Sequence, residues 1–202
     1  GSDSNLCFTN CVASWNRFTN FPADGIDQKD FGNDSRGVVI EHNTLIDCGH
    51  SEDFLSSQAS IDVRNGATVQ NNTIIFTALY DTNREGIRAQ SGIVGVESDI
   101  PVTISDNHII GNGLTAITRG LRIIGGNVTT RGNQTRDLHT GFWVTSPLWS
   151  SSQDSATDCT THGVRLDADA GAGWAADNAD INGFTARNCG IGFRLADCDR
   201  AS

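Results

Sequence analysis

The feature of this chain that most constrains its fold is a four-residue pattern, Gly-apolar-X-apolar, that recurs along its length. Five clear copies begin at Gly86, Gly120, Gly141, Gly163 and Gly192, and two looser copies begin at Gly25 and Ser60. The third positions of consecutive copies lie 21 to 35 residues apart. An internal period of this length is typical of repeat architectures, in which each unit packs on the next.

A second pattern, apolar-X-X-Asn-X-apolar, lies between copies of the first. It is clear at 40–45, 69–74 and 104–109, and weaker copies occur at 130–133 and 185–188. Both patterns alternate with a period of two and end in Gly or Asn, which predicts short strands joined by turns. We expect the recurrent Asn to adopt the left-handed conformation and to hydrogen-bond the next Asn in a ladder.

Short strands at this period, with no helix between them, predict an all-β parallel solenoid. Stacked coils bury one continuous core that no coil could bury alone. We expect one inward ladder formed by the second residue of each copy, namely Ile26, Ile61, Ile87, Leu121, Phe142, Val164 and Phe193. A β-sandwich is the alternative, because turn signals every 8 to 12 residues are also partly present.

Composition excludes several classes of protein. Only 19% of the residues are charged, and the formal net charge is −10, with 14 basic residues of which one, Lys29, is lysine. This balance argues against a coiled coil, a helical bundle or a general nucleic-acid binder, whose affinity depends on positive charge. No apolar run approaches the ~18 residues of a membrane-spanning helix.

The chain is expected to form one domain. Gly1 and Ser2 resemble a cloning remnant, and residues 3–202 are expected to be a β-helix domain from a larger protein. Six cysteines are present, at positions 7, 11, 48, 159, 189 and 198. Free thiols are favoured over a disulfide framework, and Cys159 and Cys189 should be neighbours in adjacent coils.

Two segments carry a resemblance to a known superfamily. Residues 39–46 and 104–113 resemble the repeats of right-handed parallel β-helices, shared by pectate-lyase-like proteins, alginate epimerases and bacteriophage tailspike depolymerases. Residues 24–27 and 47–50 are similar to polygalacturonase motifs, although the paired aspartates and the Arg-Ile-Lys element of that family are absent. The Asp-Pro-His element of alginate epimerases is also missing. The resemblance covers roughly residues 25–195 and implies a right-handed parallel β-helix of about seven coils.

The same resemblance implies a function. It indicates a polysaccharide-binding and polysaccharide-degrading protein of the glycoside hydrolase type, similar to tailspikes that recognise a bacterial surface glycan. It further implies a homotrimer located outside the cell or on a virion surface, with no membrane or nucleic-acid partner and no cofactor. One alternative is a uronate lyase or C5-epimerase, which needs either Arg or a Ca²⁺ cofactor beside a base to neutralise the substrate carboxylate. A non-catalytic spike or adhesin is the other.

Candidate site residues come from the third position of each Gly-apolar-X-apolar copy, which should point away from the core. Reading this position along the stack gives Asp27, Asp62, Arg88, Arg122, Trp143, Arg165 and Arg194. Asp27 and Asp62 are the predicted catalytic pair, because two neighbouring carboxylates can share acid and nucleophile roles. The arginines and Trp143 are the predicted glycan-binding residues. The alternative is structural: each Arg would pair with a loop carboxylate, and both aspartates would be turn residues.

Insertions are expected at 28–36, 49–58, 77–85, 90–100 and 145–155, where loops could supply a different acid or base. Those loops contain Glu52, Asp53, Tyr80, Asp81, Glu85, Glu97, Asp99 and Trp149. The five histidines have no metal-ligand spacing, so no metal site is predicted.

Overall fold

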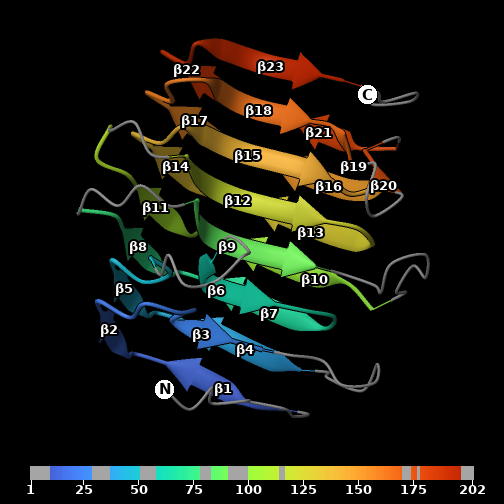
Figure 1. Ribbon diagram of the computed structural model, residues 1–202. Helices are drawn as coiled ribbons and strands as arrows, with labels where there is room; N and C mark the ends of the chain where they lie inside the picture. The colour runs from blue at the N-terminus through green and yellow to red at the C-terminus, as the bar shows by residue number, and fades with distance from the viewer. Residues whose placement is uncertain are drawn as a thin grey trace.

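The chain folds into three parallel β-sheets that wind around one core. The computed structural model describes residues 10–28, 37–50, 58–77, 83–90, 100–113, 117–169, 174–176 and 178–196. All regular elements in these ranges are strands, and each main sheet contains seven of them, hydrogen-bonded in chain order. The chain is therefore a right-handed parallel β-helix of seven coils, as predicted (Figure 1). The sandwich alternative is wrong, because all pairs within these sheets are parallel.

We name the three sheets A, B and C. Sheet A contains β1 (Val12–Ser14), β4 (Val38–Glu41), β7 (Ala67–Gln70), β10 (Val102–Ser105), β13 (Asn127–Arg131), β16 (Leu148–Ser152) and β21 (Asp180–Asn182). Sheet B contains β2 (Arg17–Thr19), β5 (Thr44–Ile46), β8 (Thr73–Ile75), β11 (His108–Ile110), β14 (Gln134–Arg136), β17 (Ser155–Thr157) and β22 (Thr185–Arg187). Sheet C contains β3 (Ile26–Asp27), β6 (Gln58–Val63), β9 (Arg84–Gln90), β12 (Thr118–Ile124), β15 (Thr140–Thr145), β18 (His162–Leu166) and β23 (Ile191–Leu195). A short antiparallel pair, β19 (Ala168–Asp169) and β20 (Trp174–Ala175), lies beside the stack.

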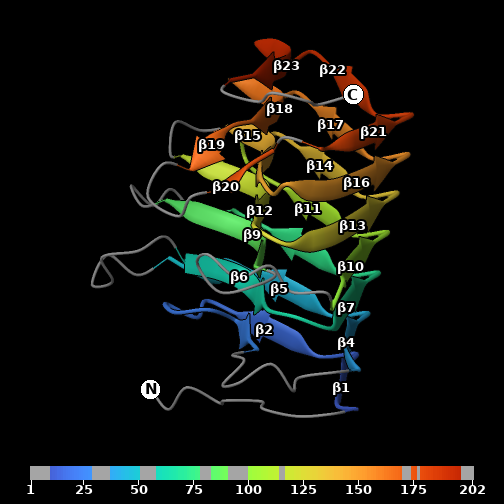
Figure 2. The ribbon, with the colours of Figure 1, turned by 90° about the vertical axis from the view of Figure 1, so that its right-hand side faces the viewer.

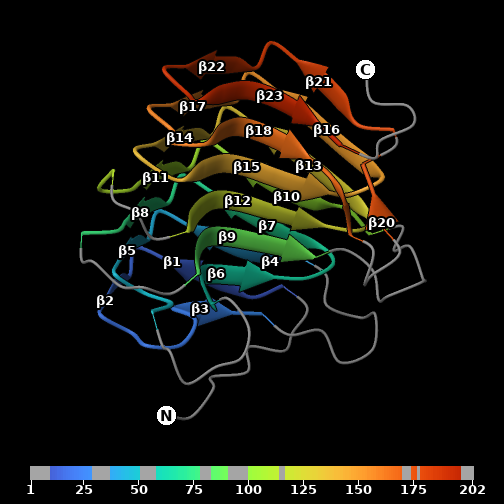
Figure 3. The ribbon, with the colours of Figure 1, turned by 45° about the horizontal axis from the view of Figure 1, so that its top comes forward.

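Each coil contributes one strand to each sheet. In one coil the chain runs along β12 in sheet C, turns through Gly125 and Gly126, and continues along β13 and β14. Sheet C faces the viewer in Figure 1, and sheet A forms the right-hand edge in Figure 2. The tilted view in Figure 3 shows sheet C lying in front of sheet A.

The predicted inward ladder is confirmed. Strand register pairs Ile26 with Ile61 and continues in sequence to Val164 and Phe193. The side chains from Ile61 to Val164 are fully buried, whereas Phe193 on the last strand is 45% exposed. One continuous apolar column therefore runs through the stack and ends at β23.

The glycine of the repeat is required by close packing between coils. A Cβ at Gly120 would lie 2.5 Å from the carbonyl oxygen of Gly141 and 2.5 Å from the Thr135 methyl carbon. At Gly163 the corresponding distance to the Gly192 carbonyl oxygen is 2.7 Å. Backbone atoms cannot move aside as a flexible side chain can, so any larger residue would push neighbouring coils apart.

The asparagine ladder is present at the corner between sheets A and B, but one part of the prediction is wrong. Asn72 donates through Nδ2 to Oδ1 of Asn107 at 3.0 Å, and Asn107 donates to Asn133 at 2.9 Å. The left-handed conformation belongs to the residue before the Asn, such as Asn71 (φ 54°) and Asp106 (φ 53°), not to the Asn itself. The preceding residue makes the corner, which leaves the Asn free to point inward.

Two local assignments are corrected by the strand register. The segment 145–155 is not an insertion, because it contains β16, and Trp149 is a core residue whose Nε1 donates to Thr130 Oγ1 at 3.0 Å. The weak Asn pattern at 185–188 belongs to the other corner, where Asn188 donates to Asp158 at 3.0 Å. The residue aligned with the asparagine ladder in that coil is Phe184, which follows Gly183 (φ 68°).

Four cysteines lie in the described ranges, and all are free thiols: Cys11, Cys48, Cys159 and Cys189. Cys159 and Cys189 are neighbours in adjacent coils, as predicted, and the amide of Gly190 donates to the Cys159 carbonyl. Burial, together with the Cys189 thiol, raises the pKa of Cys159, so this thiol stays protonated. Cys7 and Cys198 lie outside the described residues.

Candidate active site

The seven third-position residues form one ladder on sheet C, which we call the outer ladder. Register pairs Asp27 with Asp62, Asp62 with Arg88, and Arg88 with Arg122, and then continues through Trp143 and Arg165 to Arg194. Neighbouring members stand about 4.8 Å apart, the spacing of hydrogen-bonded strands. The outer ladder thus begins with carboxylates and continues with guanidinium groups and one indole.

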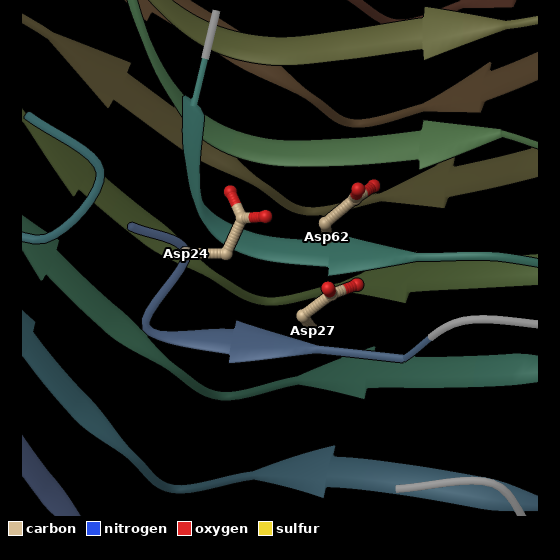
Figure 4. Close-up of side chains that lie close together, drawn as sticks. All are labelled: Asp24, Asp27 and Asp62. Atoms are coloured by element: carbon tan, nitrogen blue, oxygen red, sulfur yellow. The ribbon is translucent and has the colours of Figure 1, made fainter. Parts of the chain in front are cut away.

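Three carboxyl groups meet at the beginning of the outer ladder. Asp24, Asp27 and Asp62 each have an oxygen within 4.8 Å of the others (Figure 4). Asp27 lies on β3 and Asp62 on β6, while Asp24 lies in the turn that leads into β3. The fold therefore brings the two predicted aspartates together and adds a third one to them.

Asp24 is held in place by the coil above it. Its Oδ1 accepts a hydrogen bond from the backbone amide of Ala59 at 2.7 Å. Burial raises the pKa of Asp24 to about 6, with smaller contributions from the negative charges of Asp62 and Asp27. The Ala59 amide and the Arg88 guanidinium oppose this rise. Asp24 is therefore the carboxyl group of the cluster that can carry a proton near neutral pH.

Arg88 supplies the positive charge at this cluster. Its Nη2 lies 2.6 Å from Asp62 Oδ2 and 3.8 Å from Asp24 Oδ2. Its Nη1 lies 3.7 Å from Glu85, which also binds Arg119 at 2.8 Å. Burial alone would lower the pKa of Arg88, but the hydrogen bond and charge of Asp62 raise it, so the guanidinium remains protonated. Arg88 thereby offsets part of the negative charge of the three carboxyl groups.

The same three aspartates form the metal-compatible group found in the described part of the chain. Carboxylate oxygens could bind a cation such as Ca²⁺ at these separations. Arg88 is itself bound to two of the three carboxylates, and it already balances part of their charge. We therefore interpret the cluster by its acid–base chemistry.

The middle of the outer ladder is a stack of arginines on Trp143. The guanidinium carbons of Arg119, Arg122 and Arg165 lie 4.1, 4.3 and 4.4 Å from the centre of the indole ring. Arg122 and Arg165 come from the strands on either side of Trp143. The indole that was expected to stack on a sugar thus already has three guanidinium groups against it.

Exposure also differs from the expected pattern. The alternation predicts that every member of the outer ladder faces solvent, but Asp62 is 1% exposed and Arg122 is 7% exposed. Asp62 is covered by ion pairs with Arg88 and Arg64, and Arg122 is covered by Trp143. The ladder positions were therefore predicted correctly, while their burial was not.

The other candidate acids and bases are those of the expected insertions, and only some of them lie in the described residues. Glu52, Asp53, Tyr80, Asp81, Glu97 and Asp99 lie outside the described residues. Glu85 is buried on β9 and pairs with Arg119 and Arg88. Sequence reasoning did not select Asp24 as a site residue, although it opens the segment 24–27 that resembles a polygalacturonase motif. It also did not select Arg119, which precedes the Gly of its repeat copy.

The described part of the chain contains no helix that is long and apolar enough to cross a membrane. Comparisons with protein-family models, with curated proteins and with solved structures found no match to this chain.

Proposed function

We propose that this β-helix is a glycoside hydrolase that cleaves a polysaccharide at the Asp24, Asp27 and Asp62 cluster. The observation that carries the proposal is the meeting of three carboxyl groups within 4.8 Å, one of which has a pKa raised to about 6. Glycoside hydrolysis needs one protonated and one ionised carboxyl group on the two sides of the scissile bond. Environments that push neighbouring carboxyl pKa values apart supply such a pair.

Each aspartate has a distinct role in this proposal. Asp24 donates its proton to the glycosidic oxygen as the bond to the anomeric carbon breaks. Asp27, which is partly exposed, acts as the nucleophile or as the base that takes a proton from the attacking water. Asp62, which is paired with Arg88, stabilises the positive charge that develops on the sugar ring.

A uronate lyase or epimerase is less well supported. That chemistry needs a cation to neutralise the substrate carboxylate beside the base. Arg88 is the described cation closest to the cluster, and it is bound to Asp62, Asp24 and Glu85. The proposed substrate-binding residues are the remaining members of the outer ladder, Arg122, Trp143, Arg165 and Arg194, together with Arg88 as a neighbour of the cleaved bond.

The biological setting is part of the same proposal. The resemblance of residues 39–46 and 104–113 to tailspike repeats supports a trimeric depolymerase on a virion surface that degrades a bacterial glycan. The parallel β-helix fold supports this setting only as far as the architecture. Sedimentation equilibrium at several concentrations tests the trimer directly.

The activity is tested by incubating the protein with a panel of bacterial surface polysaccharides and measuring new reducing ends. We expect hydrolysis of at least one polymer without the ultraviolet absorbance of an unsaturated product. Asp24→Asn and Asp27→Asn should each lower the rate by about 10²–10⁴-fold, the usual contribution of a general acid or base. Asp180→Asn, at an exposed position on sheet A, is the matched control and should have no effect.

Three outcomes would contradict the proposal. An unsaturated product would identify a lyase. Glycan binding without any product would identify an adhesin. Hydrolysis that survives both Asp24→Asn and Asp27→Asn would place the active site elsewhere on the chain.

A further inference from the structure

Charge is segregated along sheet C. The first two coils place Asp24, Asp27 and Asp62 on one side of Arg88. The next coils carry four arginines on or beside the outer ladder: Arg119, Arg122, Arg165 and Arg194. The chain has a net charge of −10, so a local surplus of guanidinium groups at one end of a catalytic face calls for an explanation.

Ion pairs within the protein neutralise only some of the arginines at this basic end of sheet C. Glu85 binds Arg119, and Asp167 binds Arg165. Arg194 is exposed on β23 and has no ion-pair partner among the described residues. The two histidines nearby add no positive charge, because burial and the adjacent arginines lower the pKa values of His139 and His162.

Several donors at this basic end have no acceptor among the described protein atoms. They are the indole Nε1 of Trp143, the Nε of Arg165 and the one ring N–H of the neutral His162, whose other ring nitrogen is an unpaired acceptor. Arg165 lies 4.4 Å from the Trp143 ring, and among the charges that lower the pKa of His162 it has the largest effect. Because these nitrogens are themselves closed to solvent, the donors that a ligand can reach are those of the exposed Arg194 and the partly exposed Arg165.

The stack itself suits an anionic ligand. A guanidinium lying flat on an aromatic ring keeps its N–H groups at the edge, where they can bind a carboxylate or sulfate with two parallel hydrogen bonds. Trp143 fixes the planes of Arg122 and Arg165 and so limits the entropy that each side chain loses on binding. In this arrangement Trp143 is a positioning residue and not a platform for a sugar ring.

We propose that the arginine stack around Trp143 is an anion-binding subsite, and that the substrate is an acidic heteropolysaccharide with neutral sugars at the cleaved bond. The proposal rests on the hydrolase function above, because it uses the carboxylate cluster as the point of cleavage. Negatively charged sugars would be repelled by Asp24, Asp27 and Asp62. They would be attracted by the arginines that begin two coils further along sheet C.

The register of the outer ladder also gives the distance between the carboxylate cluster and the arginine stack around Trp143. Trp143 stands three strands beyond Asp62, which corresponds to about 14 Å at the strand spacing of a β-sheet. A glycan that follows the outer ladder would therefore carry its carboxylate or sulfate a few sugar units from the bond that is hydrolysed. A homopolymer with a charge on every sugar does not fit this pattern.

Binding is tested with three anionic polymers, namely hyaluronan, chondroitin sulfate and polygalacturonate. Each is compared with its carboxyl-reduced form of the same length, and desulfated chondroitin distinguishes carboxylate from sulfate recognition. The Asp24→Asn protein is used, so that binding is measured without cleavage, and its amide oxygen can still accept the Ala59 hydrogen bond. We expect at least one alternating polymer to bind about tenfold more tightly than its reduced form.

Substitutions test whether the preference for an anionic polymer over its reduced form depends on the arginine stack around Trp143. Arg165→Gln with Arg194→Gln should remove most of the preference for the anionic polymer, and the remaining affinity should depend little on salt. Arg187→Gln, an exposed arginine on sheet B, is the matched control and should change nothing. Trp143→Leu should weaken binding of the anionic polymer and leave binding of the reduced polymer unchanged. A sugar-stacking tryptophan would instead lose affinity for both.

The subsite proposal is overturned if no anionic polymer is preferred over its reduced form. It is also overturned if the preference survives in the Arg165→Gln, Arg194→Gln protein, or if polygalacturonate binds best. These outcomes are independent of hydrolysis: a protein that binds anionic glycans through the stack but releases no product would refute the hydrolase and leave the subsite intact.

Discussion

At the scale of single residues, two opposing effects act on the pKa of Asp24. It is partly buried beside Asp27 and Asp62, which disfavours its charge, and it accepts the Ala59 amide, which favours its charge. Burial dominates, and the pKa of Asp24 rises from 3.8 to about 6. The folded state therefore holds a proton on Asp24 more tightly than the unfolded chain does.

This difference predicts how Asp24 affects stability at different pH values. Its contribution to the free energy of unfolding should be fully present below pH ~4 and should be lost as pH rises through about 6, where the folded protein must ionise a buried group. Asp24→Asn keeps the acceptor oxygen but cannot ionise. The variant should therefore gain stability relative to the native chain between pH 4 and 6. Urea unfolding of both proteins across this range measures the difference.

Comparing Asp24→Asn with the native chain separates the effect of Asp24 on stability from the effects of other groups with shifted pKa values. Asp154 also has a raised pKa, whereas His139 and His162 have lowered pKa values and favour the folded state as pH rises through their usual range. These groups are the same in both proteins. A difference in unfolding free energy that stays constant from pH 4 to 7 would show that Asp24 does not titrate as described.

Sequence reasoning could place Asp27 and Asp62 on adjacent strands because both occupy the third position of the repeat. It could not find Asp24 in the same way, because Asp24 lies in a turn, where no alternation indicates which way a side chain points. Nor could it predict that the guanidinium groups of Arg122 and Arg165 would pack against Trp143. The repeat gives the direction of a side chain, while its partners depend on how long side chains lie along the sheet.

At the scale of elements, the corner between sheets A and B is a directional chain of hydrogen bonds. Each rung donates to the next, from Asn16 through Asn43, Asn72 and Asn107 to Asn133. Asn133 donates to Asp154 Oδ1 at 2.9 Å, and the next coil has Phe184 at this place. A carboxylate is suited to the final rung because it only accepts, whereas an Asn there would need a further acceptor.

The terminal aspartate gives a prediction for this element. Asp154 Oδ2 accepts hydrogen bonds from Thr130 at 2.6 Å and Ser151 at 2.7 Å, while Thr130 Oγ1 already accepts from Trp149. In Asp154→Asn an NH₂ group would face these hydroxyl donors, and the free energy of unfolding should fall by about 1–3 kcal/mol. Chemical denaturation measures the loss, and Asp180→Asn controls for the change in charge. Equal stability of Asp154→Asn and the native chain would contradict the directional ladder.

The ladder itself was predictable from the recurrent Asn, but its ends were not. The prediction counted Asn188 as a rung because Asn appears at the expected distance from an apolar residue. The register instead places Phe184 at the rung, and Phe184 packs against Phe142 with ring centres 5.0 Å apart. An aromatic residue can thus take the place of a hydrogen-bonding Asn at the end of the stack. The local sequence pattern does not predict this replacement.

At the scale of the whole molecule, each inner coil is stabilised by its neighbours on both sides. The fold could be predicted because seven copies of one pattern share the same inward face, and five of them share a close approach between coils at Gly25, Gly86, Gly120, Gly141 and Gly163. Burial along a column should then depend on position in the stack, since an inner coil is covered twice and a terminal coil once. Phe142 and Phe193 belong to the same column and allow this to be measured directly.

The final prediction compares these two phenylalanines. Phe142 is fully buried and packs against Trp149 and Phe184, so Phe142→Ala should lower the free energy of unfolding by about 3–5 kcal/mol. Phe193 is 45% exposed and contacts Phe184 at 5.4 Å between ring centres, so Phe193→Ala should cost less than half as much. Urea unfolding measures both losses, and Phe142→Leu provides a milder variant if Phe142→Ala fails to fold. Equal losses at the two positions would mean that β23 is covered in solution as completely as an inner strand.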